Sequence, residues 1–524
     1  YLPNIAEAVV AFLATAALGA VWASCGQDYA VPAAHARLGQ LEPVALITAD
    51  GYQFNGAPQN RAEAATELRN LLATVRIAIV VERIGSGIPG MIPWSDATSG
   101  DHSLEPLPVP FDHPLWVVFS SGSTGVPKGI VHSHGGVLLE QLKTVELHLE
   151  LSGGSTFFWF TTPSWMLWNT LVAGLLVGAT IVCYDGSPTY PRVTALWDIV
   201  DQYGVTFLGV SPGYLLDCLK NGPHLKDAHS LDTLRCVGVT GSPLPAGVAQ
   251  WLAGELGPQV RIGSTSGGTD VVTAFVGSTA TLPVRAGEIS GPCLAVAVDA
   301  YDAHGKPLIG QVGELVITAP MPSMPLRFWN DLDGERYRDA YFSTYPGVWR
   351  QGDWITITDT GGVVIHGRSD STLNRHGVRM GSTDIYDAVE RLPEIRESLV
   401  LGVEDADGGY WMPLFVVLKP GARLDYELRT RVADTIRRNA SPRHVPDDII
   451  EAPGVPHTRT GKKLEVPLKR LMQGASPETV VDLGAVDIPE LIDWYRHIAN
   501  ERPTGRRGQP SSVWPAPDCA SGRP

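Results

Sequence analysis

The sequence predicts an α/β fold of layered domains with largely parallel sheets. Short apolar runs such as Val75–Val81, Thr206–Val210 and Leu234–Val239 have the length and β-branched content of buried strands, and they alternate with helical stretches. The chain has 524 residues, 44% of them hydrophobic, with 56 glycines and 41 prolines. This length and loop-rich composition suit an enzyme with two or more domains and sizeable cores.

The pattern changes near residue 286. Short predicted strands at 295–301 and 313–318 are separated by turns that contain glycine and proline. We therefore expect a small β-rich subdomain over about 286–369, which completes a large N-terminal domain at 1–369.

A compact α+β segment follows at 370–497. Its predicted elements are helices at 383–392 and 425–439 and strands at 397–403 and 412–418. Residues 498–524 are rich in proline, glycine, arginine and serine, so we expect a disordered tail.

Residues 8–25 carry no charge and have the length of a short membrane span or signal sequence. However, they are rich in alanine, threonine and glycine, and Glu7 stands where a signal peptide would carry a basic residue. The segment is predicted to be a buried helix packed on a sheet.

Charge and cysteine usage restrict the function further. A net charge of −15 argues against an extended nucleic-acid surface, so phosphate binding should be local. The six cysteines are scattered and form no C-x-x-C pair. This pattern indicates reduced thiols in a cytoplasmic protein, with no disulfide framework and no zinc site.

The segment Phe119–Gly129, with the sequence FSSGSTGVPKG, carries the strongest functional signal. A predicted buried strand, Leu115–Phe119, runs into glycines that let the backbone curl, hydroxyls that can donate to phosphate oxygens, and the mobile charge of Lys128. It is not a Walker A loop, because Lys128 is followed by Gly129, and it is not the G-x-G-x-x-G turn of a dinucleotide fold. The alternative is a flexible surface loop.

This loop resembles the phosphate-binding motif of the acyl-adenylate-forming enzymes, which include acyl-CoA synthetases, nonribosomal adenylation domains and luciferases. Further motifs of that family follow in order at Ser264–Asp270, Trp349–Asp353, 367–370 with 374–379, and Pro456–Lys462. The resemblance covers residue 1 to about 497. It implies a mobile C-terminal domain, and it implies that a leading segment of the large domain is missing before Tyr1.

The resemblance also implies how ATP and Mg²⁺ are bound. The phosphates are assigned to Ser120, Ser121, Gly122, Ser123, Thr124, Gly125 and Lys128, and the adenine side to Gly241, Ser242 and Pro243. Thr269 and Arg379 are expected at the α-phosphate, and Asp270 replaces the usual magnesium-binding glutamate with a side chain one methylene shorter. Asp353 is expected to accept hydrogen bonds from both ribose hydroxyls, with Arg368 in support. Asp353 as a turn cap and Arg368 as a structural ion-pair partner are the alternatives.

In the family, a lysine of the last motif bridges the acyl carboxylate and the α-phosphate during adenylation and is withdrawn before thioester formation. The Thr-Gly-Lys spacing places it at Lys462, with Lys463 as the nearest competitor. Asp370 occupies the hinge position. Arg437 is a weaker candidate for coenzyme A contact.

The acyl site is implied by a comparison within the family. Acetate-activating members carry a tryptophan where this chain has Gly267, followed by Gly268, so we expect room for a longer acyl group. Aromatic residues at 157–168, Trp165 among them, would line that site, although core packing should account for about half of them. Pro163 and Ser164 stand where the family usually has small flexible residues.

The combined motifs resemble most the family members that join acetoacetate to coenzyme A. We therefore expect an acid–thiol ligase that uses acetoacetate, ATP, Mg²⁺ and coenzyme A, without nucleic-acid or membrane partners. Two alternatives remain: a ligase for another short acid such as butyrate, or a nucleotide-binding but inactive fragment.

Overall fold

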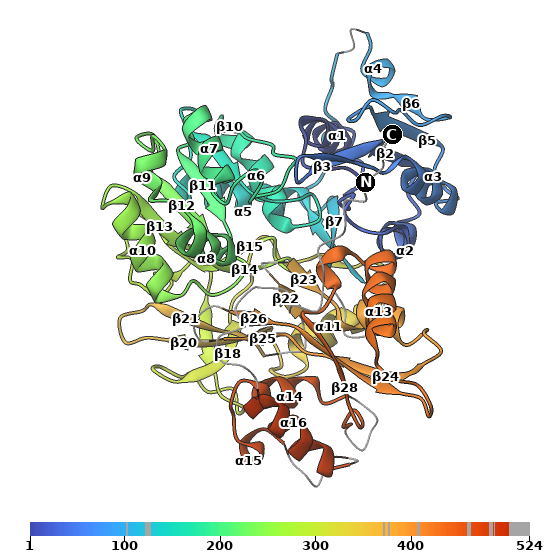
Figure 1. The fold of residues 1–524 in the computed structure, drawn as a ribbon. Helices are drawn as coiled ribbons and strands as arrows, with labels where there is room; N and C mark the ends of the chain where they lie inside the picture. The colour runs from blue at the N-terminus through green and yellow to red at the C-terminus, as the bar shows by residue number, and fades with distance from the viewer. Residues whose placement is uncertain are drawn as a thin grey trace. The chain divides into compact units, whose positions relative to one another are not determined.

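The computed structural model describes residues 1–100, 103–120, 127–369, 373–375, 378–405, 409–457, 463–481, 486 and 488–501. The chain divides into two compact units. The large unit is Tyr1–Asp370 with His376–Arg379, and the small unit is Ser371–Arg375 with Met380–Pro524. Figure 1 labels the elements in chain order.

The large unit contains a parallel sheet of five strands, in the order β10-β9-β11-β12-β13 (Figure 1). Its strands are β9 (Thr156–Trp159), β10 (Thr180–Ile181), β11 (Phe207–Val210), β12 (Cys236–Val239) and β13 (Arg261–Ser264). Because side chains alternate along a strand, each row of in-register neighbours faces one side only. Phe158, Leu208 and Val237 form one such row, and Phe157, Phe207 and Cys236 form the row on the other face.

Helices cover both faces of this sheet. The Leu208 row packs on residues of α7 (Ala195–Tyr203), α8 (Pro212–Asn221), α9 (Leu225–Ala228) and α10 (Ala246–Leu256). The Phe207 row packs on residues of the π-helix η2 (Lys143–His148) and of α6 (Met166–Ala173). The π-helix continues α5 (His134–Leu142), and the 3₁₀ turn η3 (Gly174–Val177) follows α6. The predicted layered α/β class with a parallel sheet is confirmed.

A second parallel sheet lies in the N-terminal part, in the order β2-β5-β6. Its strands are β2 (Ala45–Ala49), β5 (Ile77–Val81) and β6 (Ile92–Pro93), accompanied by the hairpin of β3 (Gly51–Phe54) and β4 (Ala57–Asn60). The helices of this region are α2 (Val31–Leu38), the 3₁₀ turn η1 (Gly39–Leu41), α3 (Ala62–Leu71) and α4 (Trp94–Ala97).

The strand that enters the phosphate motif belongs to a mixed sheet. The order is β1-β7-β8-β19, with β1 (Trp22–Ala23), β7 (Pro114–Ser120), β8 (Lys128–Ser133) and β19 (Arg327–Phe328). β7 confirms the predicted strand, but β7 and β8 run antiparallel, and so do β8 and β19. The expectation of largely parallel sheets does not extend to this sheet, because the chain turns back on itself after Ser120.

The uncharged N-terminal segment is not one buried helix, as was predicted for residues 8–25. Helix α1 (Ala6–Ala17) ends early, and the chain continues into strand β1. Phe12 packs against three tryptophans, Trp22, Trp116 and Trp168, at ring-centroid distances of 5.9, 5.8 and 6.0 Å. The opposite face is exposed at Val10 and Leu13, so the helix buries only one side.

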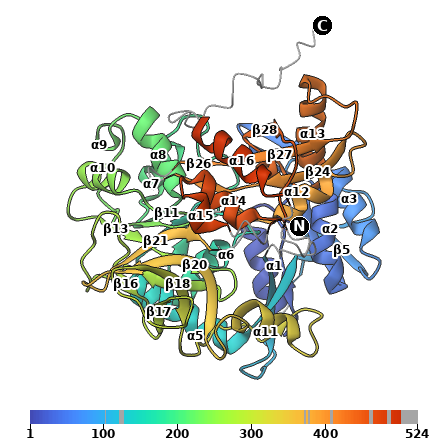
Figure 2. The ribbon, with the colours of Figure 1, turned by 90° about the horizontal axis from the view of Figure 1, so that it is seen from below.

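Two antiparallel sheets complete the large unit. The β-rich region is the sheet β17-β18-β20-β21, with β17 (Val298–Tyr301), β18 (Val312–Ile317), β20 (Trp349–Ile357) and β21 (Val363–Arg368), drawn from a second side in Figure 2. Before it come β14 (Ser266–Gly268), β15 (Thr273–Gly277) and β16 (Gly291–Pro292). Helix α11 (Glu335–Phe342) precedes β20.

The small unit contains a sheet in the order β24-β27-β28. The strands of this sheet are β24 (Ile395–Val400), β27 (Pro413–Leu418) and β28 (Asp448–Glu451). A separate pair in the small unit is β25 (Val403–Glu404) with β26 (Tyr410–Trp411). β22 (Leu373–Arg375) pairs with β23 (Val378–Met380), where the chain passes from one unit to the other. The helices of the small unit are α12 (Ser382–Val389), α13 (Tyr426–Asn439), the 3₁₀ turn η4 (Pro442–His444), α14 (Glu465–Met472), α15 (Pro477–Val480) and α16 (Glu490–Glu501). Helices α14 and α16 lie side by side in both views (Figures 1 and 2). Both predicted helices are present, whereas the strand predicted at 397–403 is divided between β24 and β25.

Two further expectations concern the described residues only. Within the described residues, no helix has the length and apolarity that a membrane crossing needs. Cys25, Cys183, Cys218, Cys236 and Cys293 are free cysteines in the structure. Cys519 and the tail from residue 502 lie outside the described residues.

Candidate active site

The phosphate motif connects two strands of an antiparallel hairpin. Ser120 at the end of β7 pairs in register with Lys128 at the start of β8. The Lys128 ammonium lies 5.5 Å from the ring centroid of Phe328 on β19, and Gln40 donates to the carbonyl of Pro127 at 3.1 Å. Ser121, Gly122, Ser123, Thr124 and Gly125 lie outside the described residues.

Thr269 and Asp270 occupy the turn between β14 and β15. Asp270 is only 9% exposed, and its carboxylate accepts a hydrogen bond from the Tyr341 hydroxyl at 2.6 Å between Oδ1 and Oη. Its backbone carbonyl lies 2.8 Å from Nε2 of His132 on β8. The turn is therefore held from two other elements of the large unit, α11 and β8.

The protonation of His132 follows from its surroundings. A carbonyl can only accept a hydrogen bond, so Nε2 of His132 must carry the proton that Asp270 accepts. Burial lowers the pKa of His132 to about 4. The imidazole is therefore a neutral donor at physiological pH and adds no positive charge beside Asp270.

The same turn ends in an unusual backbone conformation. Val272 is fully buried and has a φ of 50°, in the left-handed region that β-branched residues rarely adopt. The buried amide of Gln141 on α5 donates to the Val272 carbonyl at 2.6 Å. Thr144 on η2 bonds to the next residue, Thr273, at 3.2 Å between hydroxyl oxygens. Such strain persists only where neighbours over-determine the conformation, and here α5 and η2 do so.

An aromatic cluster joins this turn to the Trp349–Asp353 motif. The rings of Tyr341 and Trp349 are stacked, with centroids 3.6 Å apart and planes 13° from parallel. The ring centroids of Phe328 and Tyr341 are 5.6 Å apart. The Trp349 indole N–H donates to Oε1 of Gln351 at 3.0 Å. Three motifs that are distant in sequence are thus assembled around Phe328, Tyr341 and Trp349.

Strand β20 is bulged at the end of this motif. Arg350 pairs with Val316 and Trp354 pairs with Glu314, so residues 351–353 of β20 stand opposite the single residue 315 of β18. Gly352 has a φ of 85°, a conformation that favours glycine. Bulges of this kind re-aim side chains, and this one directs Asp353 differently from a regular strand.

The buried carboxylate of Glu314 fixes this bulge. It accepts hydrogen bonds from the backbone N–H of Gly352 and the hydroxyl of Ser369, both at 2.9 Å. It also forms an ion pair with Arg350, with 3.3 Å between Oε2 and Nε. Burial raises the pKa of Glu314, and the charge of Arg350 opposes that shift.

The two residues predicted at the ribose lie side by side. Asp353 and Arg368 are in-register partners on β20 and β21, and Nη1 of Arg368 lies 3.3 Å from Oδ1 of Asp353. Both side chains are almost fully buried. A carboxylate whose position is fixed in this way suits the binding of two neighbouring hydroxyls.

The predicted adenine-side residues Gly241, Ser242 and Pro243 follow β12 of the five-stranded parallel sheet. Thr240 beside them donates to the carbonyl of Thr265, just before β14, at 2.8 Å. In open α/β sheets, ligands bind outside the carboxyl ends of the strands, where these segments lie.

Gly267 and Gly268 were predicted to line the acyl site. The structure gives another reason for glycine at both positions, because neighbouring residues approach their Cα atoms closely. A Cβ at Gly267 would overlap the Thr273 carbonyl and lie 2.6 Å from the Cα of Ala274, both on β15. A Cβ at Gly268 would lie 2.7 Å from the Gln351 amide. Position 267 therefore needs glycine because two strands approach closely there, and a side chain from this position would meet backbone before any acyl pocket.

Most aromatic residues at 157–168 belong to the core. Phe157, Phe158, Trp159 and Trp168 are buried, whereas Trp165 at the start of α6 is partly buried. Ser24 donates to the carbonyl of Pro163 at 2.7 Å, and the N–H of Gly26 donates to the Ser164 hydroxyl, so the segment before Trp165 is anchored. Trp165 stays a prediction for the acyl site.

Four candidates remain. Asp370 and Lys462 lie outside the described residues, and Arg379 is on β23 with a side chain that the structure does not describe. Arg437 on α13 is half-exposed and pairs with Asp434. Its role at coenzyme A stays a prediction.

Asp270 fits a magnesium ion only as one ligand among several. In the described part of the chain, no three His, Cys, Asp or Glu side chains are grouped to hold a metal. Mg²⁺ commonly uses one or two carboxylates and completes its shell with water and substrate phosphates. A Cβ at Gly268 would lie 3.3 Å from Oδ2 of Asp270, so glycine leaves room beside that oxygen.

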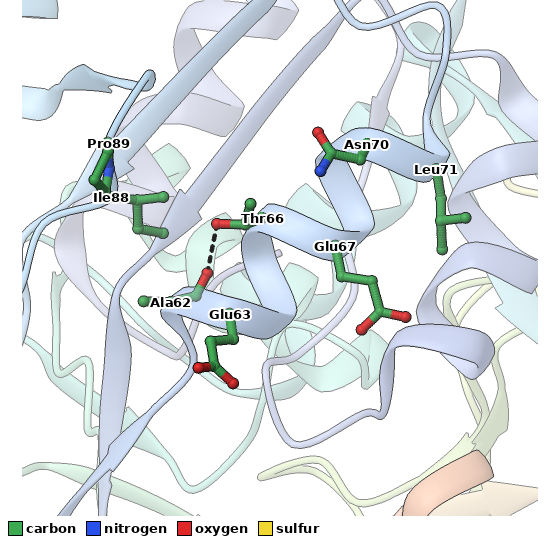
Figure 3. A pocket seen from close by; sticks show the side chains of 8 residues that line it. All are labelled: Ala62, Glu63, Thr66, Glu67, Asn70, Leu71, Ile88 and Pro89. Atoms are coloured by element: carbon green, nitrogen blue, oxygen red, sulfur yellow. Dashed lines mark hydrogen bonds between the residues drawn. The ribbon is translucent and has the colours of Figure 1, made fainter.

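A cavity of about 550 Å³ lies elsewhere in the large unit (Figure 3). Six of its residues, among them Glu63, Glu67 and Leu71, come from α3, and Ile88 and Pro89 face them. It contains none of the motif residues.

Several residues that support the site were not identified by the sequence analysis. Three of them, Tyr341, His132 and Glu314, contact motif residues, and Gln141 contacts Val272, two residues after the Ser264–Asp270 motif. Each is a common residue type outside the motif segments. A polar residue within an apolar strand, as for His132 in β8 and Glu314 in β18, is the pattern that could have drawn attention to two of them.

The fold and this arrangement define an adenylate-forming enzyme, and family models agree. The model of the AMP-binding enzyme matches residues 1–324, and that of the AMP-binding enzyme C-terminal domain matches 385–462. The chain belongs to the AMP-binding enzyme family, in its acetoacetyl-CoA synthetase group. The family resemblance inferred from the sequence is therefore confirmed.

Relatives of this group align with nearly the whole chain. Acetoacetyl-CoA synthetase of Gallus gallus is 39% identical over 511 residues, covering 95% of this chain and 76% of that protein. Acetoacetyl-coenzyme A synthetase of Rhizobium meliloti is 40% identical over 94% of this chain and 76% of its own length. Malonamoyl-CoA synthetase of Penicillium aethiopicum is 34% identical, covering 96% of this chain and 72% of that protein.

A solved structure is similar as well. Acetoacetyl-CoA synthetase from Streptomyces lividans has 53% sequence identity and a TM-score of 0.71, over 96% of this chain and 77% of that one.

The hydrogen bond from Tyr341 to Asp270 is testable. Tyr341→Phe keeps the ring stacked on Trp349 but removes the donor to a buried carboxylate, so the free energy of unfolding should fall by about 1–3 kcal/mol in urea titrations. Tyr337→Phe, in the same aromatic cluster, is the matched control. Equal effects of the two substitutions would contradict the importance of the bond.

The close approach at Gly267 leads to a second prediction. Gly267→Ala should lower the free energy of unfolding by about 1–3 kcal/mol through overpacking against β15, and should reduce activity on acetate and acetoacetate alike. Activity assays with both acids and thermal unfolding check it. A loss confined to acetoacetate would instead favour a direct acyl role for this position.

Proposed function

We propose that this chain joins acetoacetate to coenzyme A in an ATP-dependent reaction that passes through an acyl-adenylate and releases AMP and pyrophosphate. The observation that carries the proposal is the similarity to acetoacetyl-CoA synthetases over nearly the whole chain. A carboxylate is a poor electrophile, so the acid must first be activated. Its oxygen attacks the α-phosphorus of ATP, and the coenzyme A thiol then displaces AMP.

The motif residues of the large unit supply the adenylation chemistry in this proposal. Ser120, Lys128 and the residues between them hold the β- and γ-phosphates, and Thr269 contacts the α-phosphate. Arg379 would donate to an α-phosphate oxygen. Fixed positive charge and preorganised donors are the main way to stabilise the charge that develops in such a step.

The nucleotide is oriented by three further groups. Asp353 accepts hydrogen bonds from the ribose hydroxyls, with Arg368 fixing that carboxylate, and Gly241–Pro243 flank the adenine. Mg²⁺, if held by Asp270 and the phosphates, would neutralise negative charge on the phosphates while the adenylyl group is transferred to the acid and pyrophosphate leaves. The Tyr341 hydroxyl donates to Oδ1 of Asp270 and so restricts where this short side chain can place its carboxylate.

A panel of short acids tests the substrate. Pyrophosphate release should be fastest with acetoacetate, and slower with butyrate, which lacks the 3-oxo group. Malonamate belongs in the panel because one relative is named a malonamoyl-CoA synthetase and this acid replaces the methyl of acetoacetate by an amino group. Faster release with malonamate or butyrate would reassign the substrate, and ATP binding without release for any acid would indicate an inactive nucleotide-binding chain.

The ribose role of Asp353 predicts a selective loss. Asp353→Ala should raise the KM for ATP more than that for the acid, since each lost hydrogen bond costs about 1–3 kcal/mol. Asp359→Ala, on the exposed turn after the same strand, is the control. Initial-rate kinetics in both substrates decide the matter, and an unchanged KM for ATP with full activity would rule out the ribose role.

Lys462 is proposed to act in the first half-reaction only. Lys462→Ala should reduce acyl-adenylate formation by a factor on the order of 10²–10³, while thioester formation from supplied acyl-adenylate is spared. Acetoacetate-dependent ATP–pyrophosphate exchange measures the first step. If Lys463→Ala gave the larger loss in adenylation, the assignment to Lys462 would be wrong.

A further inference from the structure

Lys463, the residue after the proposed catalytic lysine, is fully engaged within the small unit. Its Nζ lies 2.8 Å from Oε1 of Glu390 and donates to the carbonyl of Ser398 at 2.8 Å. The same ammonium lies 3.8 Å from the ring centroid of Tyr386. An ammonium has three N–H donors, and this one has a carboxylate, a carbonyl and an aromatic face around it.

The Tyr386 ring is a fixed platform for this charge. Its hydroxyl donates to Oε1 of Glu465 at 2.6 Å and accepts from the backbone N–H of Val400 at 3.2 Å. Burial, reinforced by the charge of Glu465, raises the pKa of Tyr386 well above its ordinary value. The phenol is therefore a neutral donor that ties α12 to the first turn of α14, beside Lys463.

The residue on the other side of 458–462 is held by the same strand. Nε2 of His457 lies 2.7 Å from Oε1 of Glu397, the neighbour of Ser398 on β24. His457 and Lys463 are partners in an isolated antiparallel β-bridge, and the N–H of Leu464 donates to the carbonyl of Pro456 at 3.1 Å. Both residues that flank 458–462 are thus fixed to β24.

We propose that Lys463 is a positioning residue, which holds the chain directly beside Lys462 on α12 and β24 and acts on adenylation through Lys462. This inference rests on the proposed role of Lys462. The charge of Lys463 is compensated by Glu390, so the two adjacent lysines differ in function. One is fixed by the fold, and the other is the one proposed to reach the substrate.

The experiment compares Lys463→Ala and Glu390→Gln with a matched control, Lys469→Ala. Lys469 on α14 also forms a largely buried ion pair in the small unit, with Glu404 at 2.9 Å, but it is not adjacent to Lys462. Adenylation is measured by acetoacetate-dependent ATP–pyrophosphate exchange. The second half-reaction is measured by thioester formation from supplied acetoacetyl-adenylate.

Lys463→Ala and Glu390→Gln should slow adenylation by about ten- to a hundredfold, because small misplacements of a reacting group have effects of that size. Thioester formation should stay near that of the unsubstituted protein, and Lys469→Ala should change neither rate. In the Lys462→Ala background, Lys463→Ala should cause no further loss, since its effect passes through the lysine already removed.

Equal slowing of both half-reactions by Lys463→Ala, a further loss in the Lys462→Ala background, or an effect no larger than that of Lys469→Ala would each overturn the proposal. Amide hydrogen exchange of the peptide 456–464 gives an independent measurement, which should be faster in Lys463→Ala and unchanged in Lys469→Ala. Unchanged exchange in Lys463→Ala would also overturn it. Absence of exchange between ATP and pyrophosphate in the unsubstituted protein would instead overturn the proposed function.

Discussion

The buried carboxylate of Asp270 and the hydroxyl of Tyr341 form the contact on which the large unit's site most depends. A carboxylate that is removed from water must be compensated by donors, and each donor has to come from an element folded into place. Tyr341 brings α11 to the turn, and His132 brings β8 to the backbone of the same residue. The strained conformation of Val272, supported by Gln141, shows that the turn is determined by its neighbours and not by local preference.

The Asp353 region depends on a second buried carboxylate, that of Glu314. Its hydrogen bonds to Gly352 and Ser369 stabilise a bulge at the point where β20 presents Asp353 to Arg368. The aromatic contact between Trp349 and Tyr341 connects this strand with the Asp270 turn. The residues proposed for the nucleotide and for Mg²⁺ are consequently connected through one aromatic cluster, and a change in that cluster should affect both.

The environment of Lys463 bears on the choice between the two adjacent lysines of the last motif. Lys463 has an ion pair, a carbonyl and an aromatic ring within the small unit, which hold its charge in one place. A lysine bound in this way loses the mobility that a bridging role in catalysis needs. The spacing of the motif pointed to Lys462 for that role, and the contacts of Lys463 support the same choice on physical grounds.

The sequence by itself determined the order of motifs, the family and the positions of several buried strands, because apolar runs and short motifs are local properties of the chain. The ends of β7, β11 and β12 differ from those of the predicted strands by at most two residues. Only the tertiary structure decided that β7 and β8 are antiparallel, that α1 buries one face, and that a Cβ at Gly267 would meet the backbone of β15. It also brought Tyr341 to Asp270. Strand direction, the direction of a Cβ and the partner of a buried carboxylate all depend on residues far away in the chain, so no local pattern can specify them.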